Sequence, residues 1–73
     1  MNIYIASDIH NDVTTCVTSH SSLELARDAL AFRAQIATND LKLTELYDEY
    51  FQDVREWICE YGEIRLTILN DQF

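Results

Sequence analysis

Apolar side chains recur at steps of three and four along residues 40–63, which is the period of an amphipathic helix. The positions on this stripe are Leu43, Leu46, Tyr47, Tyr50, Phe51, Val54, Trp57, Ile58 and Tyr61. Acidic residues recur at similar steps on the opposite side, at Glu45, Glu49, Asp53, Glu56 and Glu60. The pattern predicts one long helix with an aromatic face toward the core and an acidic stripe toward solvent.

Near the N-terminus the apolar and polar positions alternate instead. In residues 2–9, Ile3 and Ile5 share one face and Tyr4 lies on the other, which predicts a strand. Residues 10–12 read His-Asn-Asp, and Asn and Asp side chains bond the local backbone and favour a turn. Residues 13–19 are rich in Thr and Val, so we expect a second strand, paired with the first as a hairpin and lying at the sheet edge.

A first helix is predicted between the hairpin and the long helix. Ser21 and Glu24 have the spacing of a capping box, and the helix should run to about Ala37. It is apolar on two sides, which predicts contacts with both the sheet and the second helix. Arg33 falls between these sides. Its head could reach solvent while its stem is buried, or it could pair with a carboxylate of the second helix.

The sole glycine, Gly62, follows the last periodic residue and suits the left-handed position after a helix. Residues 63–69 alternate and predict a third strand, followed by a frayed tail at residues 70–73. We therefore expect a single small acidic α+β domain over residues 1–73 with the order ββααβ. The third strand could pair in parallel with the first strand or antiparallel with the second. We favour the first strand, which gives a three-stranded sheet in the order 2-1-3 with two antiparallel helices packed on one face.

Charge narrows the classes of partner. The formal net charge is -8, and eight of the thirteen acids lie in residues 40–63 against two bases there. This excess argues against direct binding of nucleic acid or of an anionic membrane. It permits a basic protein partner. The sequence shows no signal peptide and no apolar run long enough for a membrane span, so we expect a cytoplasmic protein whose Cys16 and Cys59 are free thiols.

Residues 3–12, IYIASDIHND, resemble the opening of calcineurin-type metallophosphoesterases, where a strand ends in Asp-x-His and both side chains bind metal. The resemblance would make Asp8 and His10 metal ligands. The Gly-Asp and Gly-Asn-His motifs of that family are absent, and His20 is the only other histidine. Neither cysteine belongs to a CxxC motif or has a flanking cation. We predict no metal, no cofactor and no catalytic residues.

In size, acidity and lack of catalytic residues the chain resembles small phage-encoded inhibitors of host defence, such as anti-CRISPR and anti-restriction proteins. The resemblance is to a class and assigns no residues. It implies a non-enzymatic inhibitor or modulator of a basic, nucleic-acid-handling partner, acting in the host cytoplasm if the chain is phage-encoded. We expect the contact surface to be the acidic stripe of Glu45, Glu49, Asp53, Glu56 and Glu60. The alternative is a small homodimeric assembly module with no inhibitory role.

Overall fold

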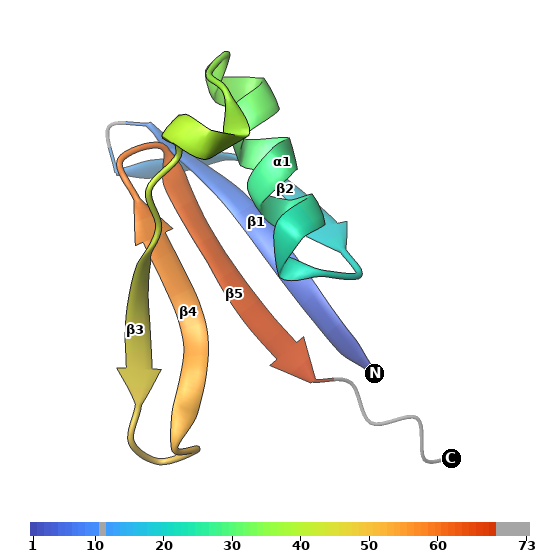
Figure 1. Cartoon of the computed structure of the whole chain (residues 1–73), viewed down its shortest axis with the longest axis vertical. Helices are drawn as coiled ribbons and strands as arrows, with labels where there is room; N and C mark the ends of the chain where they lie inside the picture. The colour runs from blue at the N-terminus through green and yellow to red at the C-terminus, as the bar shows by residue number, and fades with distance from the viewer. Residues whose placement is uncertain (11, 69–73) are drawn as a thin grey trace.

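The computed structural model describes residues 1–10 and 12–68 of the chain. In these residues five strands form one antiparallel sheet and a single α-helix packs on one of its faces (Figure 1). The elements, in chain order, are β1 (Asn2–His10), β2 (Val13–His20), α1 (Leu23–Ala34), a 3-10 turn η1 (Thr38–Asp40), β3 (Thr44–Asp48), β4 (Asp53–Cys59) and β5 (Gly62–Ile68). The strand order is β2-β1-β5-β4-β3, so β2 is an edge strand, as its Thr content predicted.

The predicted second helix is wrong, because residues 40–63 form the β3–β4 hairpin and lead into β5. The two strands are rich in Thr, Tyr, Val, Trp and Ile, which pack well on a pleated surface. The turn between them contains Gln52 at a left-handed φ of 57°. The spacing of three and four arose because two alternating strands and a turn, taken together, imitate a helical stripe.

The predicted three-stranded sheet with two helices is therefore also wrong. With one helix in the connection, the last strand runs antiparallel to β1, whereas two helices would have made the two strands parallel. Gly62 does not end a helix and has no positive φ. It opens β5, where an added Cβ would lie 2.1 Å from the carbonyl oxygen of Ser7 in β1.

The helix α1 begins one residue later than the capping-box prediction. Ser22 is the N-cap, and its hydroxyl accepts a hydrogen bond from the amide of Leu25 at 3.1 Å. The helix ends at Ala34, since Gln35 takes a left-handed conformation with a φ of 60°. It therefore stops three residues before the predicted end at Ala37.

The core lies between α1 and the face of the sheet that it covers. Its buried members are Ala6, Ala26, Leu30, Ala31, Leu41, Trp57 and Ile64. Three of these seven come from α1, and two of those are alanines, which let the helix approach the sheet closely. The helix packs on β1, β2 and β5. The β3–β4 hairpin extends beyond it as an arm (Figure 1). The predicted tail at residues 70–73 and the end of the predicted last strand at residue 69 lie outside the described residues.

The opposite face of the sheet has no helix over it in the described part of the chain. Because side chains alternate along strands, the register places Ile3 and Ile5 of β1 on this open face, together with Arg65 of β5 and Ile58 of β4. We call it the open face. It mixes aliphatic and charged side chains.

Candidate functional site

The β3–β4 arm, residues 44–59, exposes large aromatic side chains at its tip. Tyr50 is 86% exposed, Tyr47 is 61% exposed and Phe51 is 49% exposed. The sequence pattern assigned all three to the core, so this assignment is wrong. Aromatic residues are enriched among the side chains that dominate protein–protein binding, and an arm that leaves three of them in solvent is a candidate contact surface.

The turn at the tip of the arm is fixed by local contacts. The Asp48 carboxylate accepts hydrogen bonds from the amides of Tyr50 at 2.9 Å and Phe51 at 3.4 Å. Such a side-chain bond to the amide two residues on is the usual way in which Asp stabilises a turn. The guanidinium of Arg55 lies 3.6 Å from the centre of the Phe51 ring and donates to Asp53 at 3.1 Å. The aromatic tip is thus held in shape before any partner binds.

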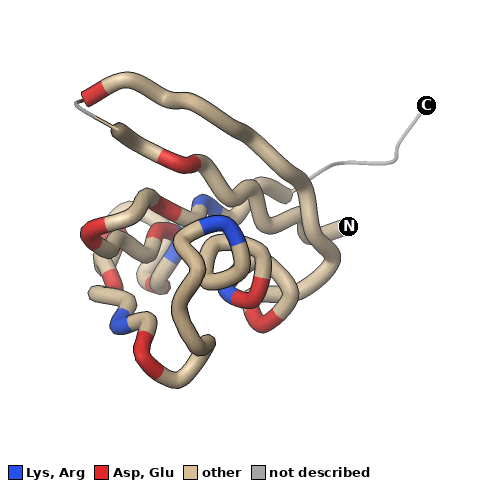
Figure 2. The backbone as a smooth tube through the Cα atoms, turned by 90° about the horizontal axis from the view of Figure 1, so that it is seen from above, with Lys and Arg blue, Asp and Glu red and all other residues tan. Residues whose placement is uncertain are grey.

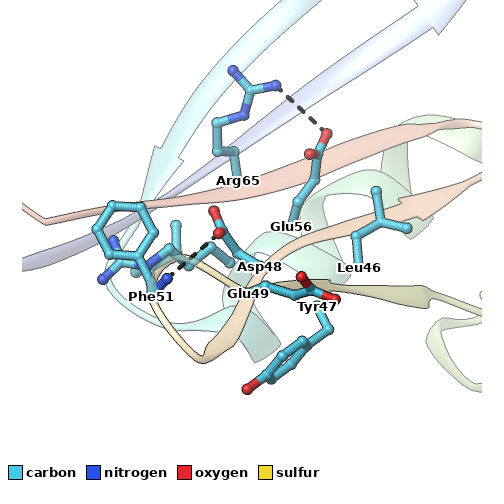
Figure 3. A pocket seen from close by; sticks show the side chains of 9 residues that line it. Leu46, Tyr47, Asp48, Glu49, Phe51, Glu56 and Arg65 are labelled. Carbon is cyan, nitrogen blue, oxygen red and sulfur yellow. Dashed lines mark hydrogen bonds and ion pairs between the residues drawn. The ribbon is translucent and has the colours of Figure 1, made fainter.

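A cleft separates the arm from β5. The pairing of β4 with β5 begins at Cys59 and Gly62 and stops at Glu56 and Arg65, so the ladder does not continue to the end of β5 at Ile68. Beyond that point the two strands diverge, as Figure 1 shows. The space between them is a cavity of about 470 Å³. We call it the β4–β5 cleft; its walls are Leu46, Tyr47, Asp48, Glu49, Phe51, Arg55, Glu56, Arg65 and Leu66 (Figure 3).

The walls of this cleft carry three carboxylates, those of Asp48, Glu49 and Glu56, against two guanidinium groups, and Asp53 lies next to it. Asp48 and Asp53 lie directly opposite each other at the end of the β3–β4 ladder, a like-charge pair that is unfavourable unless a cation offsets it. The two guanidinium groups are already engaged, Arg55 with Asp53 at 3.1 Å and Arg65 with Glu56 at 3.5 Å. A further positive charge would therefore be favoured in the cleft.

On the open face beside the cleft, the carboxyl groups of Glu63 and Glu56 contact each other, and the contact changes the pKa of Glu63. A hydrogen bond with Glu56 raises the pKa of the Glu63 carboxyl, and partial burial and repulsion by the same neighbour raise the pKa further. Arg65 lowers the pKa of Glu63 in opposition, at an ion-pair distance of 3.9 Å. At neutral pH the negative charges of Glu63 and Glu56 repel each other.

The five residues predicted as an acidic stripe do not form one. Glu45 lies in β3 opposite Trp57, on the side of the sheet that α1 covers. Glu49 is in the β3–β4 turn, and Asp53 begins β4. Glu56 lies on the open face, and Glu60 is in the turn between β4 and β5. Figure 2 shows the acidic positions scattered along the backbone. Only Glu49 and Glu56 of the five line the cleft.

The carboxylate that the phosphoesterase resemblance would use is engaged elsewhere. Asp8 accepts a hydrogen bond from Arg33 Nε at 2.7 Å, and this bond raises the pKa of Arg33. Arg33 thus pairs with a strand carboxylate, where the sequence left a helix carboxylate or a solvent-facing head as alternatives. It also donates to the Thr18 hydroxyl at 3.0 Å. The described residues hold no group of three His, Cys, Asp or Glu side chains placed to bind a metal. Cys16 and Cys59 are free thiols, as predicted.

Comparisons with known proteins supply no relative: no protein family model, no curated protein and no solved structure matches this chain. In the described residues no helix has the length and apolar character needed to cross a bilayer.

Proposed function

We propose that this chain is a non-enzymatic protein-binding module that docks its β3–β4 arm on a basic partner. The observation that carries the proposal is the arm itself, a preformed hairpin whose exposed tip presents Tyr47, Tyr50 and Phe51. Aromatic anchors on a rigid turn lose little conformational entropy when they are buried by a partner.

Charge indicates the kind of partner. The arm carries five carboxylates, those of Glu45, Asp48, Glu49, Asp53 and Glu56, against the single guanidinium of Arg55. Half of the net charge of the chain therefore lies on this hairpin. A basic surface complements it and would speed association at low salt. Proteins that handle nucleic acid present such surfaces, so we propose that the arm inhibits or modulates one of them, in the cytoplasm, by competing with its nucleic acid.

A second candidate is a homodimeric assembly module. It is favoured by the open face, where Ile58 is 37% exposed and no element of the described chain covers the sheet. Two such faces could bury each other. The net charge of -8 opposes this association, so we rank it below the arm.

Capture from lysates treated with nuclease, at low and high salt, tests the proposal. Four forms are compared: wild type, Tyr47→Ala with Tyr50→Ala, Glu45→Lys with Glu49→Lys, and a control. The control, Glu24→Lys with Asp40→Lys, makes the same charge change at exposed positions of α1 and η1. Melting curves confirm that each variant is folded.

We expect wild type and the control to retain one basic protein that is released by salt, and both arm variants to lose it. Duplex or single-stranded nucleic acid should compete with wild type for the purified partner. Equal capture by the arm variants would overturn the proposal. Loss of capture by the control as well would show that general charge, not the arm, is responsible.

A further inference from the structure

A second cavity lies beside α1, on the face of the sheet that the helix covers. The helix packs on β1, β2 and β5, and β3 and β4 lie beyond it. There α1, the connection from η1 to β3, and the arm border a space of about 470 Å³. We call it the helix–arm cavity; its walls include Leu23 and Arg27 of α1, Leu41 and Leu43 of the connection, and Trp57 of β4.

Arg27 differs from the other arginines because no carboxylate balances its charge. Arg33, Arg55 and Arg65 each form an ion pair with an Asp or Glu side chain. Within residues 1–10 and 12–68 Arg27 forms no such pair, although the chain has thirteen acids and only five bases. Its Nη2 donates to the carbonyl oxygen of Leu41 at 2.8 Å, which holds the guanidinium at the cavity wall. A guanidinium has several more N–H donors, so others remain for a ligand.

Two donors at this cavity are buried and have no acceptor in the described part of the chain. They are Nε1 of Trp57, a residue that is only 7% exposed, and Nε of Arg27. Native proteins contain few buried donors of this kind, because each one loses its bond to water without replacement. A ligand oxygen could accept from them after neighbouring side chains shift. Glu24 and Lys42 line the same cavity and are long, exposed side chains that can move in this way.

The lining of the cavity indicates a carboxylate attached to an aliphatic group. An arginine head binds a carboxylate through two parallel N–H···O bonds. Leu23, Leu41 and Leu43 offer aliphatic surface in the same space. Glu24 and Glu45 also line the cavity, and their charges disfavour a ligand with two negative charges, such as a phosphate. The volume of about 470 Å³ is in the range of small-molecule sites.

We propose that the helix–arm cavity binds a carboxylate that carries an aliphatic group. The carboxylate lies on Arg27 and Trp57, and the aliphatic group lies on Leu41 and Leu43. A small organic acid and the C-terminal end of a peptide both supply this chemistry. The site does not depend on the basic partner proposed for the arm.

The probe is 4-methylpentanoate, a carboxylate with a branched aliphatic chain. Trp57 is the sole tryptophan, so its indole N–H gives a single resonance in the full chain. We expect this resonance to move downfield as the probe is added, with a Kd of about 0.1 to 1 mM for so small a ligand. The amide of the same acid has the same shape without the charge and should bind at least about tenfold more weakly. Inorganic phosphate should leave the resonance in place.

A matched pair of variants tests the guanidinium. Arg27→Lys and Arg65→Lys both keep a positive charge, but only the first removes a guanidinium from the cavity, because Arg65 lies on the open face. We expect Arg27→Lys to bind 4-methylpentanoate about tenfold more weakly and Arg65→Lys to bind it like wild type. Melting curves confirm that both variants are folded.

Arg27 also holds the Leu41 carbonyl, so a second variant tests the site without changing that bond. Trp57→Phe keeps an aromatic ring in the core and removes the unpartnered N–H. We expect calorimetry to show about three- to tenfold weaker binding of 4-methylpentanoate, the effect of one lost hydrogen bond.

The acetylated tripeptide Ala-Ala-Leu and its C-terminal amide distinguish the two sources of the carboxylate. Tighter binding of the tripeptide acid than of 4-methylpentanoate would identify the end of a peptide chain as the ligand. Tighter binding of 4-methylpentanoate would identify a small organic acid. Either result supports the site, since both require the free carboxylate.

Four results would overturn the proposal. The indole resonance of Trp57 could stay in place at about 10 mM 4-methylpentanoate. The acid and its amide could bind equally, which would mean that the aliphatic group alone is recognised. Arg27→Lys and Arg65→Lys could bind equally, which would mean that Arg27 does not hold the carboxylate. Phosphate could move the indole resonance as far as the acid does, which would make the cavity a general anion site.

Discussion

At Gly62 a single hydrogen atom in place of a side chain lets two strands meet. An added Cβ would lie 2.1 Å from the carbonyl oxygen of Ser7, and a backbone atom cannot swing away as a side chain can. We expect Gly62→Ala to lower the free energy of unfolding by about 2 kcal/mol, because β1 and β5 must separate to fit the methyl group. Urea denaturation measures the change. Thr67→Ala on the same strand is the control, and an unchanged midpoint for Gly62→Ala would refute the steric explanation.

At Glu63 the contact with Glu56 makes stability depend on pH. The pKa of the folded state lies above the ordinary value of 4.5, so the folded protein binds the proton more tightly than the unfolded chain does. The protonated Glu63 carboxyl therefore favours folding, and this contribution to stability is lost as pH rises from about 4.5 through the raised pKa. Glu63→Gln keeps a hydrogen-bond donor toward Glu56 and removes one charge.

We therefore expect Glu63→Gln to stabilise the fold at neutral pH by about 0.5 kcal/mol, a modest value because the site is partly exposed and screened. Its stability should also fall less than that of wild type between pH 4.5 and neutrality. Urea titrations at a series of pH values test this. Glu45→Gln removes the same charge on the opposite side of the sheet, which α1 covers, and serves as the control. A lower stability of Glu63→Gln at neutral pH would contradict the assignment.

The helix α1 is tied to the sheet at its C-terminal end by Arg33. This guanidinium bonds Asp8 of β1 at 2.7 Å and Thr18 of β2 at 3.0 Å, so one side chain joins three elements. Asp8 Oδ1 and Arg33 Nη2 are buried and have no hydrogen-bond partner in the described residues. No other contact of these two atoms would therefore replace the bond between the two side chains. We expect Arg33→Met to lower the free energy of unfolding by about 2 kcal/mol, because it leaves a partly buried carboxylate unpaired.

A double-mutant cycle separates this interaction from simple packing. Asp8→Asn alone should cost less than Arg33→Met, since the amide oxygen still accepts from the guanidinium. The two changes together should be less harmful than their sum by about 1 kcal/mol, as for directly bonded partners. Additive losses, measured by denaturation, would mean that the pair contributes only through independent contacts.

The turn of the β3–β4 arm places a residue other than glycine, Gln52, in a strained left-handed conformation. Gln52 has a φ of 57°, a conformation that glycine adopts at little cost and other residues adopt less readily. We expect Gln52→Gly to raise the free energy of unfolding by about 0.5 to 1 kcal/mol and to leave partner capture intact, because the tip keeps its shape. Gln52→Ala is the control, with no gain expected. Destabilisation by Gln52→Gly would contradict this account of the turn.

Across the whole molecule, the sequence predicted the elements whose local signals agree with their packing. The alternation of Ile3 and Ile5 predicted β1, and the serines before Leu23 predicted the start of α1 to within one residue. Residues 40–63 could not be predicted in this way, because Trp57 meets the core equally well from a helical stripe or from an alternating strand. Tertiary contacts decide between helix and strand here, because β5 pairs with β1 on one side and with β4 on the other.

The candidate site could not be predicted either, because the sequence pattern assigned residues 40–63 to a helix. Glu49 and Glu56 do line the β4–β5 cleft, but they were grouped on a helix that does not form. The cleft itself depends on where β4 and β5 stop pairing, which no residue in either strand signals alone. The one local clue in the sequence was Asp48, since an Asp side chain commonly accepts a hydrogen bond from the amide two residues on and so stabilises a turn, as it does here with Tyr50.

The two candidate functions differ in what the whole molecule should do in solution. If the arm is the binding surface, the chain should stay a monomer of 8.5 kDa over a wide range of concentration, because its net charge of -8 repels a second copy. Sedimentation equilibrium at low and moderate salt measures this. Ile58→Glu places a charge on the open face and should leave the mass unchanged, whereas a dimer formed through that face would dissociate. A dimer in wild type that Ile58→Glu abolishes, with the arm variants still dimeric, would favour the assembly module over the arm.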